Sequence, residues 1–265
     1  MSLEKTYAFV LKSYDWSESS RTISFFTRNF GKLSLVDKGG RGLTAKRGRV
    51  INFSELELTF YESQKDSNGY ISDVELIRMF ELSGDGSLGR LAYASAAVEL
   101  LQLLLPKEEP LIDLYEYSVS FLDKINQAKK QALSSLFLTF FLRLLSQLGY
   151  HPSLGYCVAC DKKIESFIKD GAAVRFSPER GGVVCPSCQN PGEYYIALPY
   201  EGFAKLVELQ TASLNEAENV TLGFKETSLL LDALVNFLEY QADVSQKIKS
   251  LEFLHKLKNA KTLME

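Results

Sequence analysis

All four cysteines of this chain lie in two close pairs within one short stretch. They occur as Cys157-x2-Cys160 and Cys185-x2-Cys188, with 24 residues between the pairs. A two-residue spacer lets both thiolates of a pair face one metal ion, so two such pairs can supply the four corners of a tetrahedral zinc site. Because protein then fills every corner, the pattern predicts one structural Zn2+ ion and leaves no open position for catalysis.

Other uses of the four thiols fit the sequence less well. Two disulfides need an oxidising compartment. The N-terminus, however, lacks a secretory signal, and no apolar run approaches the roughly 18 residues that span a bilayer, so we expect a cytoplasmic protein with no membrane contact. A thioredoxin-type redox pair needs a βαβ unit, which the pattern lacks. A four-thiolate iron–sulfur cluster stays open, although nothing else in the sequence indicates electron transfer.

The segment between the two cysteine pairs predicts a β-hairpin. A strand is expected over 173–176, a turn over 178–182 and a second strand over 183–184, which leads into the second pair. His151 lies six residues before Cys157 and is either a reserve metal ligand or, more simply, a residue at a helix end. His255 lies in a late amphipathic segment and is read as a solvated or packed side chain.

The first 80 residues predict a small β-barrel. Five short segments are rich in β-branched and aromatic residues and are separated by glycine-containing turns. They span 6–14, 21–29, 32–38, 50–62 and 70–77. Five strands in this length suit an OB-type barrel, and an SH3-like barrel fits the same count.

The rest of the chain is dominated by a helical pattern. Apolar residues recur at three- and four-residue spacing, which predicts helices over 91–105, 111–125, 131–149, 200–210, 226–241 and 246–258. The predicted fold class is therefore α+β. We expect an N-terminal five-stranded barrel (1–80) and a helical domain (81–153 and 195–265) that carries the four-cysteine zinc ribbon as an insertion (154–194).

Charge is distributed unevenly along the chain. The net charge is −3, yet residues 1–54 hold ten Lys or Arg and four Asp or Glu, a balance of +6. The stretch KGGRGLTAKRGR (38–49) contains five basic residues, four glycines and no acid. A flexible basic loop of this kind can follow phosphates. The alternative is a solvated loop whose charges only aid solubility.

Aromatic residues beside this loop offer faces on which bases could stack, although each one also suits a barrel core. They are Tyr7, Phe9, Phe25, Phe26 and Phe30. Strand alternation puts Phe25 and Phe26 on opposite faces, so at most one of them can belong to the barrel core. The motifs GxxxxGK[ST], GxSxG and HExxH are absent. The sequence therefore favours a protein that is not an enzyme.

Taken together, these segments resemble the bacterial RecO family of recombination mediators. The resemblance rests on AFVLKSYDWSESSRTISFFTRNFGKLSLVDKGGRG (8–42), FLRLLSQLGYHPSLGYCVAC (141–160), FSPERGGVVCPSC (176–188) and KSLEFLHKL (249–257). These stretches occur in collinear order over nearly the whole chain. One departure is Asn52, where the family often has proline shortly after the basic loop. Some family members lack the cysteines, which implies that the zinc is structural.

The resemblance implies a function in DNA repair. It implies binding of single- and double-stranded DNA without sequence preference, annealing of complementary strands, pairing with RecR, and loading of RecA onto DNA coated by single-strand-binding protein. We assign the DNA contacts to eight basic residues: Arg21, Arg28, Lys32, Lys38, Arg41, Lys46, Arg47 and Arg49. For the acidic tail of the coat protein, side-chain chemistry alone suggests Arg143 with the apolar residues Phe140 and Leu144. The alternatives are an RNA-binding protein with the same modules and a nucleic-acid-modifying enzyme with an OB accessory domain.

Overall fold

The computed structural model describes residues 2–15, 20–38, 50–62, 68–84, 86–168, 171–242, 244 and 248–253. Contacts within the chain divide it into two compact units, Met1–Gln127 and Ala128–Glu265, and each is described by itself. The first unit therefore holds two helices in addition to the predicted barrel, and the expected three-domain division stays a prediction. No helix of the described ranges is long and apolar enough to cross a membrane.

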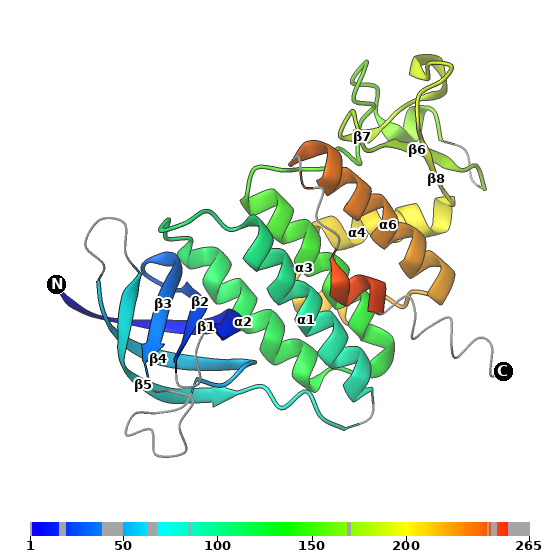
Figure 1. Cartoon of the computed structure of the whole chain (residues 1–265). Helices are drawn as coiled ribbons and strands as arrows, with labels where there is room; N and C mark the ends of the chain where they lie inside the picture. The colour runs from blue at the N-terminus through cyan, green and yellow to red at the C-terminus, as the bar shows by residue number, and fades with distance from the viewer. Residues whose placement is uncertain are drawn as a thin grey trace. The chain divides into compact units, whose positions relative to one another are not determined.

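The first unit begins with a closed five-stranded barrel, seen in blue and cyan in Figure 1. Its strands are β1 (Leu3–Asp15), β2 (Ser20–Thr27), β3 (Gly31–Lys38), β4 (Ser54–Tyr61) and β5 (Gly69–Met79). They are joined in the order β1-β2-β3-β5-β4, and β4 pairs back onto β1. All pairs are antiparallel except β3 with β5. This order is that of an OB-type barrel, so the structure confirms the OB alternative.

The barrel interior is filled by the inward-facing residues of each strand. Alternation along β2 places Ile23 and Phe25 inside, where they pack with Leu35 of β3 and Leu58 of β4. All four side chains are buried. The β-branched and aromatic residues that predicted the strands therefore also form this core.

A helix of the same unit covers the outer side of β1 and β2 around Phe9 and Phe26. This helix, α2 (Ile112–Gln127), follows α1 (Ser87–Leu104). The ring of Tyr115 from α2 lies 5.6 Å from that of Phe9 and 5.5 Å from that of Phe26. The Tyr115 hydroxyl donates a hydrogen bond to Glu55 of β4 at 3.3 Å. Phe9 and Phe26 are thus buried outside the barrel, and neither is available to stack on a base.

The linker between α1 and α2 lies directly on the start of β3. A single parallel bridge joins Lys32 to Lys107, and the N–H of Glu108 donates to the carbonyl of Lys32 at 3.2 Å. Gly31 makes this approach possible. A Cβ atom at Gly31 would lie 2.1 Å from the carbonyl oxygen of Glu109, and its φ of +66° is in the left-handed region that favours glycine.

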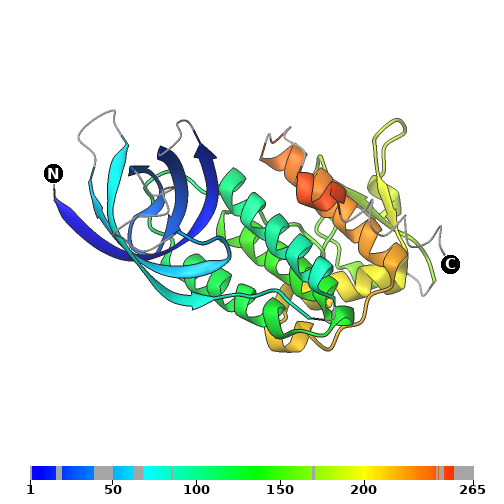
Figure 2. The same ribbon diagram turned by 60° about the horizontal axis from the view of Figure 1, so that its bottom comes forward.

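The second unit combines a helical bundle with a small sheet. Its helices are α3 (Leu133–Gln147), α4 (Tyr200–Thr211), α5 (Leu214–Ala217) and α6 (Phe224–Gln241), and α3 packs against the other three. Its sheet, with the order β7-β6-β8, consists of β6 (Val174–Ser177), β7 (Gly182–Val183) and β8 (Ile196–Leu198). Single 3-10 turns cover Lys130–Ala132, Ile164–Ser166 and Pro186–Cys188. Figure 2 shows these helices and the strands of this sheet from a second side.

The predicted hairpin between the cysteine pairs is confirmed by the antiparallel pairing of β6 with β7. The sequence pattern did not predict β8, which pairs with β6 on its other side, or the short helix α5. Residues 249–253 are helical, in agreement with the last predicted helix, whose residues 246–247 and 254–258, His255 among them, lie outside the described residues.

Replacing Gly31 with Ala should destabilise the first unit strongly. The new methyl group would clash with the backbone of residue 109, and the left-handed conformation costs an L-residue about 1–2 kcal/mol. Gly149→Ala is the matched control, because Gly149 has a φ of +87° but nothing within 4 Å of the added Cβ. Denaturant unfolding should show a clearly larger loss of stability for Gly31→Ala. Equal losses of stability for the two variants would show that the close contact between Gly31 and residue 109 does not add to the cost of the substitution.

Candidate metal centre and nucleic-acid interface

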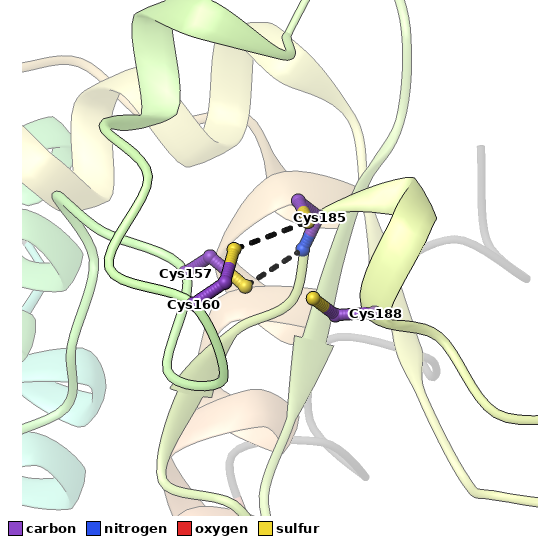
Figure 3. Close-up of side chains that lie close together, drawn as sticks. All are labelled: Cys157, Cys160, Cys185 and Cys188. Carbon is purple, nitrogen blue, oxygen red and sulfur yellow. Dashed lines mark hydrogen bonds between the residues drawn. The ribbon is translucent and has the colours of Figure 1, made fainter.

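The four cysteines converge on one point in the second unit. Their sulfur atoms all lie within 4.8 Å of one another, and they point toward a common centre from two separate loops (Figure 3). The sulfur atoms of Cys160 and Cys185 are 3.7 Å apart. Four thiolates bound tetrahedrally at about 2.3 Å would lie about 3.8 Å from one another, so this geometry suits a single metal ion. Cys157, Cys160, Cys185 and Cys188 can therefore hold a metal, as the spacing predicted.

Backbone hydrogen bonds align the first cysteine pair with the second. The N–H of Val158 donates to the carbonyl of Val183 in β7 at 2.9 Å, and the N–H of Val183 donates to the carbonyl of Ser153 at 2.9 Å. Gly182 permits this contact, since a Cβ there would lie 2.4 Å from the carbonyl oxygen of Ser153. The loop that carries Cys157 is thus fixed against the strand that leads into Cys185.

A polar network supports the second cysteine pair. Arg180 donates one hydrogen bond to the carbonyl of Cys188 at 3.2 Å and another to the carboxylate of Glu193. The hydroxyl of Tyr195 and the amide of Asn190 also donate to Glu193. Hydrogen bonds from Tyr195, Asn190 and Arg180 together lower the pKa of Glu193. This network gives the loop after Cys188 a fixed shape.

The thiol of Cys157 is prepared for ionisation. Burial alone would raise its pKa, but backbone N–H groups of Cys185, Ala159 and Cys160 oppose this and lower the pKa to about 6. One of these bonds, from the N–H of Cys185 to the Cys157 sulfur, measures 3.3 Å. A thiolate is the form that binds metal.

The apolar core of this module is small. It comprises Cys157, Val184 and Cys185, with four partly buried neighbours. Burial on this scale cannot offset the conformational entropy of ordering the loops, so a bound metal would supply much of the folding free energy. His151 is exposed and its Nδ1 lies 3.3 Å from the hydroxyl of Ser146, so it belongs to the end of α3 and not to the cysteine cluster.

The candidate nucleic-acid interface is the outer face of β1, β2 and β3 in the first unit. Strand pairing aligns Tyr14 of β1 with Thr22 of β2, Thr22 with Val36 of β3, and Val36 with Tyr70 of β5. Paired residues point to the same face of a sheet, so these four side chains form one row across the barrel. We call it the tyrosine row. It lies on the strands that OB-type barrels use for oligonucleotides.

A lysine accompanies each tyrosine of this row. The ammonium of Lys12 lies 4.6 Å from the ring centroid of Tyr14, and that of Lys38 lies 3.9 Å from the ring centroid of Tyr70. Tyr14 is 46% exposed. Aromatic faces beside cations are the elements that bind bases and phosphates of a single strand. Composition indicates Lys38 but not Lys12, Tyr14 and Tyr70, whose proximity depends on strand register.

The described basic residues expected to contact DNA lie in different surroundings. Arg21 forms an ion pair with the buried carboxylate of Asp37 at 3.0 Å, and Arg28 pairs with Glu116 of α2. These two charges are already neutralised within the protein. Lys32 instead lines a groove at the start of β3. Arg41, Lys46, Arg47 and Arg49 lie outside the described residues.

The three residues assigned to partner binding also differ in exposure. Phe140 and Leu144 of α3 are both 0% exposed and belong to the core, so they offer no surface to a partner. Arg143 of the same helix is exposed. The spacing of Phe140 and Leu144 places them on one apolar side of α3. The sequence alone could not show that other elements of the fold cover this side.

Comparisons with known proteins agree over both parts of the chain. The family profile described as "Recombination protein O N terminal" matches residues 1–80, and that described as "Recombination protein O C terminal" matches residues 86–252. A protein from Symbiobacterium thermophilum called "DNA repair protein RecO" is 28% identical over 98% of this chain and 100% of its own length. Relatives with the same name from Chlorobium phaeobacteroides and Caldanaerobacter subterraneus are 25% and 32% identical, over 96% and 69% of this chain and 98% and 70% of their own lengths.

The profile matches cover the barrel and the cysteine-bearing helical part in the same order in which they occur in the structure. The chain belongs to the RecO family of DNA repair proteins.

Proposed function

We propose that this protein is a recombination mediator that binds DNA through its barrel. It binds single and double strands without sequence preference and anneals complementary strands. Together with RecR, it loads RecA onto DNA coated by single-strand-binding protein. It carries out these steps by binding and not by covalent catalysis.

The tyrosine row is the observation that carries this proposal. Two lysine–tyrosine pairs flank Thr22 and Val36 on the outer face of the barrel. Stacking on an aromatic face tolerates every base, because each base has a π-face, and a lysine holds a phosphate without reading sequence. The basic segment 38–49 begins at Lys38, beside this row, and supplies further phosphate contacts in our proposal.

The second unit provides the partner site in this proposal. The acidic tail of single-strand-binding protein docks against α3 through Arg143, whose guanidinium can pair with a carboxylate. The four cysteines hold one Zn2+ ion, which orders the ribbon and takes no part in a reaction.

Annealing of coated strands tests the function. The wild-type protein should anneal complementary oligonucleotides both when they are naked and when they carry single-strand-binding protein. Arg143→Glu should retain the first activity and lose most of the second, because the reversed charge repels an acidic tail. Arg175→Glu on β6 is the matched charge reversal and should retain both. A wild-type protein that neither binds nor anneals DNA, or that prefers RNA in competition, would overturn the proposal.

Two kinds of variant should separate stacking from charge. Tyr14→Ala should weaken single-strand binding by about 1–3 kcal/mol with an unchanged salt dependence, because stacking releases no counterions. Changing Arg41, Lys46, Arg47 and Arg49 together to Ala should reduce the slope of log affinity against log salt by roughly three for single strands. Binding to two unrelated oligonucleotides over a salt series measures both effects, with circular dichroism as the control for folding. A folded quadruple variant with the wild-type slope would place the DNA path elsewhere.

The metal prediction is one zinc per chain. Cys185→Ser should lose the metal and unfold the hairpin of β6 and β7, whereas His151→Ala should retain it. Elemental analysis of protein prepared without chelator gives the stoichiometry, and hydrogen exchange of residues 174–184 reports the hairpin. A wild-type protein without metal, or with iron in place of zinc, would contradict the assignment. DNA binding through the barrel should largely survive the loss of metal.

A further inference from the structure

A groove of about 430 Å3 lies at the start of β3, next to the tyrosine row, in the first unit. Ser34 of β3 lines it, and Ser34 shares the outer face of β3 with Val36. Two lysines also line it, Lys32 of β3 and Lys107 of the linker between α1 and α2. Lys107 lies outside both regions that the sequence analysis assigned to binding.

The backbone fixes the two lysines beside each other. Lys32 and Lys107 face each other in a parallel bridge, and the N–H of Glu108 holds the carbonyl of Lys32. Glu108 has a φ of +56°, which is an unfavourable conformation for a residue with a side chain. Such strain persists only where surrounding contacts enforce it, and it is concentrated at functional sites. Here Gly31 packs closely against the backbone of the next residue, Glu109.

Neither lysine has an anionic partner within the part of the chain that the structure describes. Lys32 donates one hydrogen bond, at 3.1 Å, to the carbonyl of Gln102, which uses one of its three donors. Among the described residues, neither ammonium forms an ion pair with a carboxylate. Glu62 and Glu108 also line the groove, but Glu62 accepts a hydrogen bond from the hydroxyl of Ser2.

Two like charges held together in a partly buried groove destabilise each other. Burial and the charge of Lys107 both lower the pKa of Lys32. An oxyanion placed between the ammonium groups would remove this repulsion and accept hydrogen bonds from both. Asn29 and Asn68 line the same groove and carry amide groups that can donate to the remaining oxygens.

We propose that Lys32 and Lys107 together bind one phosphate group of the nucleic-acid backbone, at the end of the path marked by the tyrosine row. This inference rests on the proposed DNA binding and adds to it Lys107, a residue of the linker between α1 and α2. Lys32 and Lys38 are six residues apart on one strand, so this phosphate site lies about 20 Å from Lys38. A single strand bound along β3 would span the distance between them.

Salt-dependent binding of single-stranded oligonucleotides tests the pair. Lys107→Ala should lower affinity about fivefold and reduce the slope of log affinity against log salt by about 0.7, the value for one phosphate. The Lys32→Ala/Lys107→Ala double variant should lose less than the sum of the two single losses, because both side chains hold the same phosphate. Lys107→Arg should retain the slope. Lys5→Ala, which removes a lysine paired with Glu57, is the matched control and should bind like wild type.

NMR of the lysine side chains gives a readout that does not depend on affinity. The pKa of Lys32 should lie below 10.5 in the free protein and rise in Lys107→Ala, where the neighbouring charge is gone. It should also rise when an oligonucleotide binds, because a phosphate stabilises the protonated form. A second NMR titration uses inorganic phosphate in place of the oligonucleotide. Saturation by inorganic phosphate with no response to oligonucleotide would overturn the nucleic-acid assignment.

Different results would contradict the phosphate site and the proposed function. If wild type binds DNA and a folded Lys107→Ala has the same affinity and slope, only the phosphate site is wrong. If wild type does not bind DNA at all, the proposed function fails first. Thermal unfolding of each variant confirms that the linker still holds the barrel.

Discussion

Among the described residues, two residue pairs join β3 to β5, and the arrangement of the candidate DNA-binding face depends on them. Leu35 pairs with Gly69 and Val36 pairs with Tyr70, in parallel orientation, and this contact closes the barrel. The same contact brings Tyr70 into line with the side chains of β1, β2 and β3 and places it under Lys38. Without this contact the barrel would be open between β3 and β5. The other strand pairs would still enclose a core, but the outer face would lose Tyr70, one end of the tyrosine row.

Local pattern was sufficient to predict most elements of this fold but not the surfaces that they expose. The five strands, the main helices and the hairpin between the cysteine pairs follow from periodicity and turn residues, which are local properties. Burial of Phe26 depends on Tyr115, about ninety positions further along the chain. The spacing of apolar residues along the sequence does not indicate that contact. The same holds for Arg28, whose partner Glu116 lies on the same helix.

The two parts of the candidate site differed in how much of them could be predicted. A pair of metal-binding cysteines is recognised by a spacing of two residues, so the sequence alone identified all four cysteines of the cluster that can hold a metal. A nucleic-acid face is encoded by register among strands that are far apart in sequence. Composition therefore identified a basic region but could not show that Asp37 neutralises Arg21, which was expected to contact DNA. It also could not identify Lys12 or Lys107.

The ribbon is attached to the helices in a way that affects how the chain tolerates change. It lies within the segment 148–199, between α3 and α4, and these two helices pack directly against each other. The helical contact thus closes a loop whose entropic cost depends only weakly on its length, since doubling such a loop costs about 0.6 kcal/mol. Gln241 of α6 adds one more attachment by donating to the carbonyls of Pro178 and Glu179. This junction can therefore accept a longer or shorter insert during evolution while the helical bundle keeps its own packing.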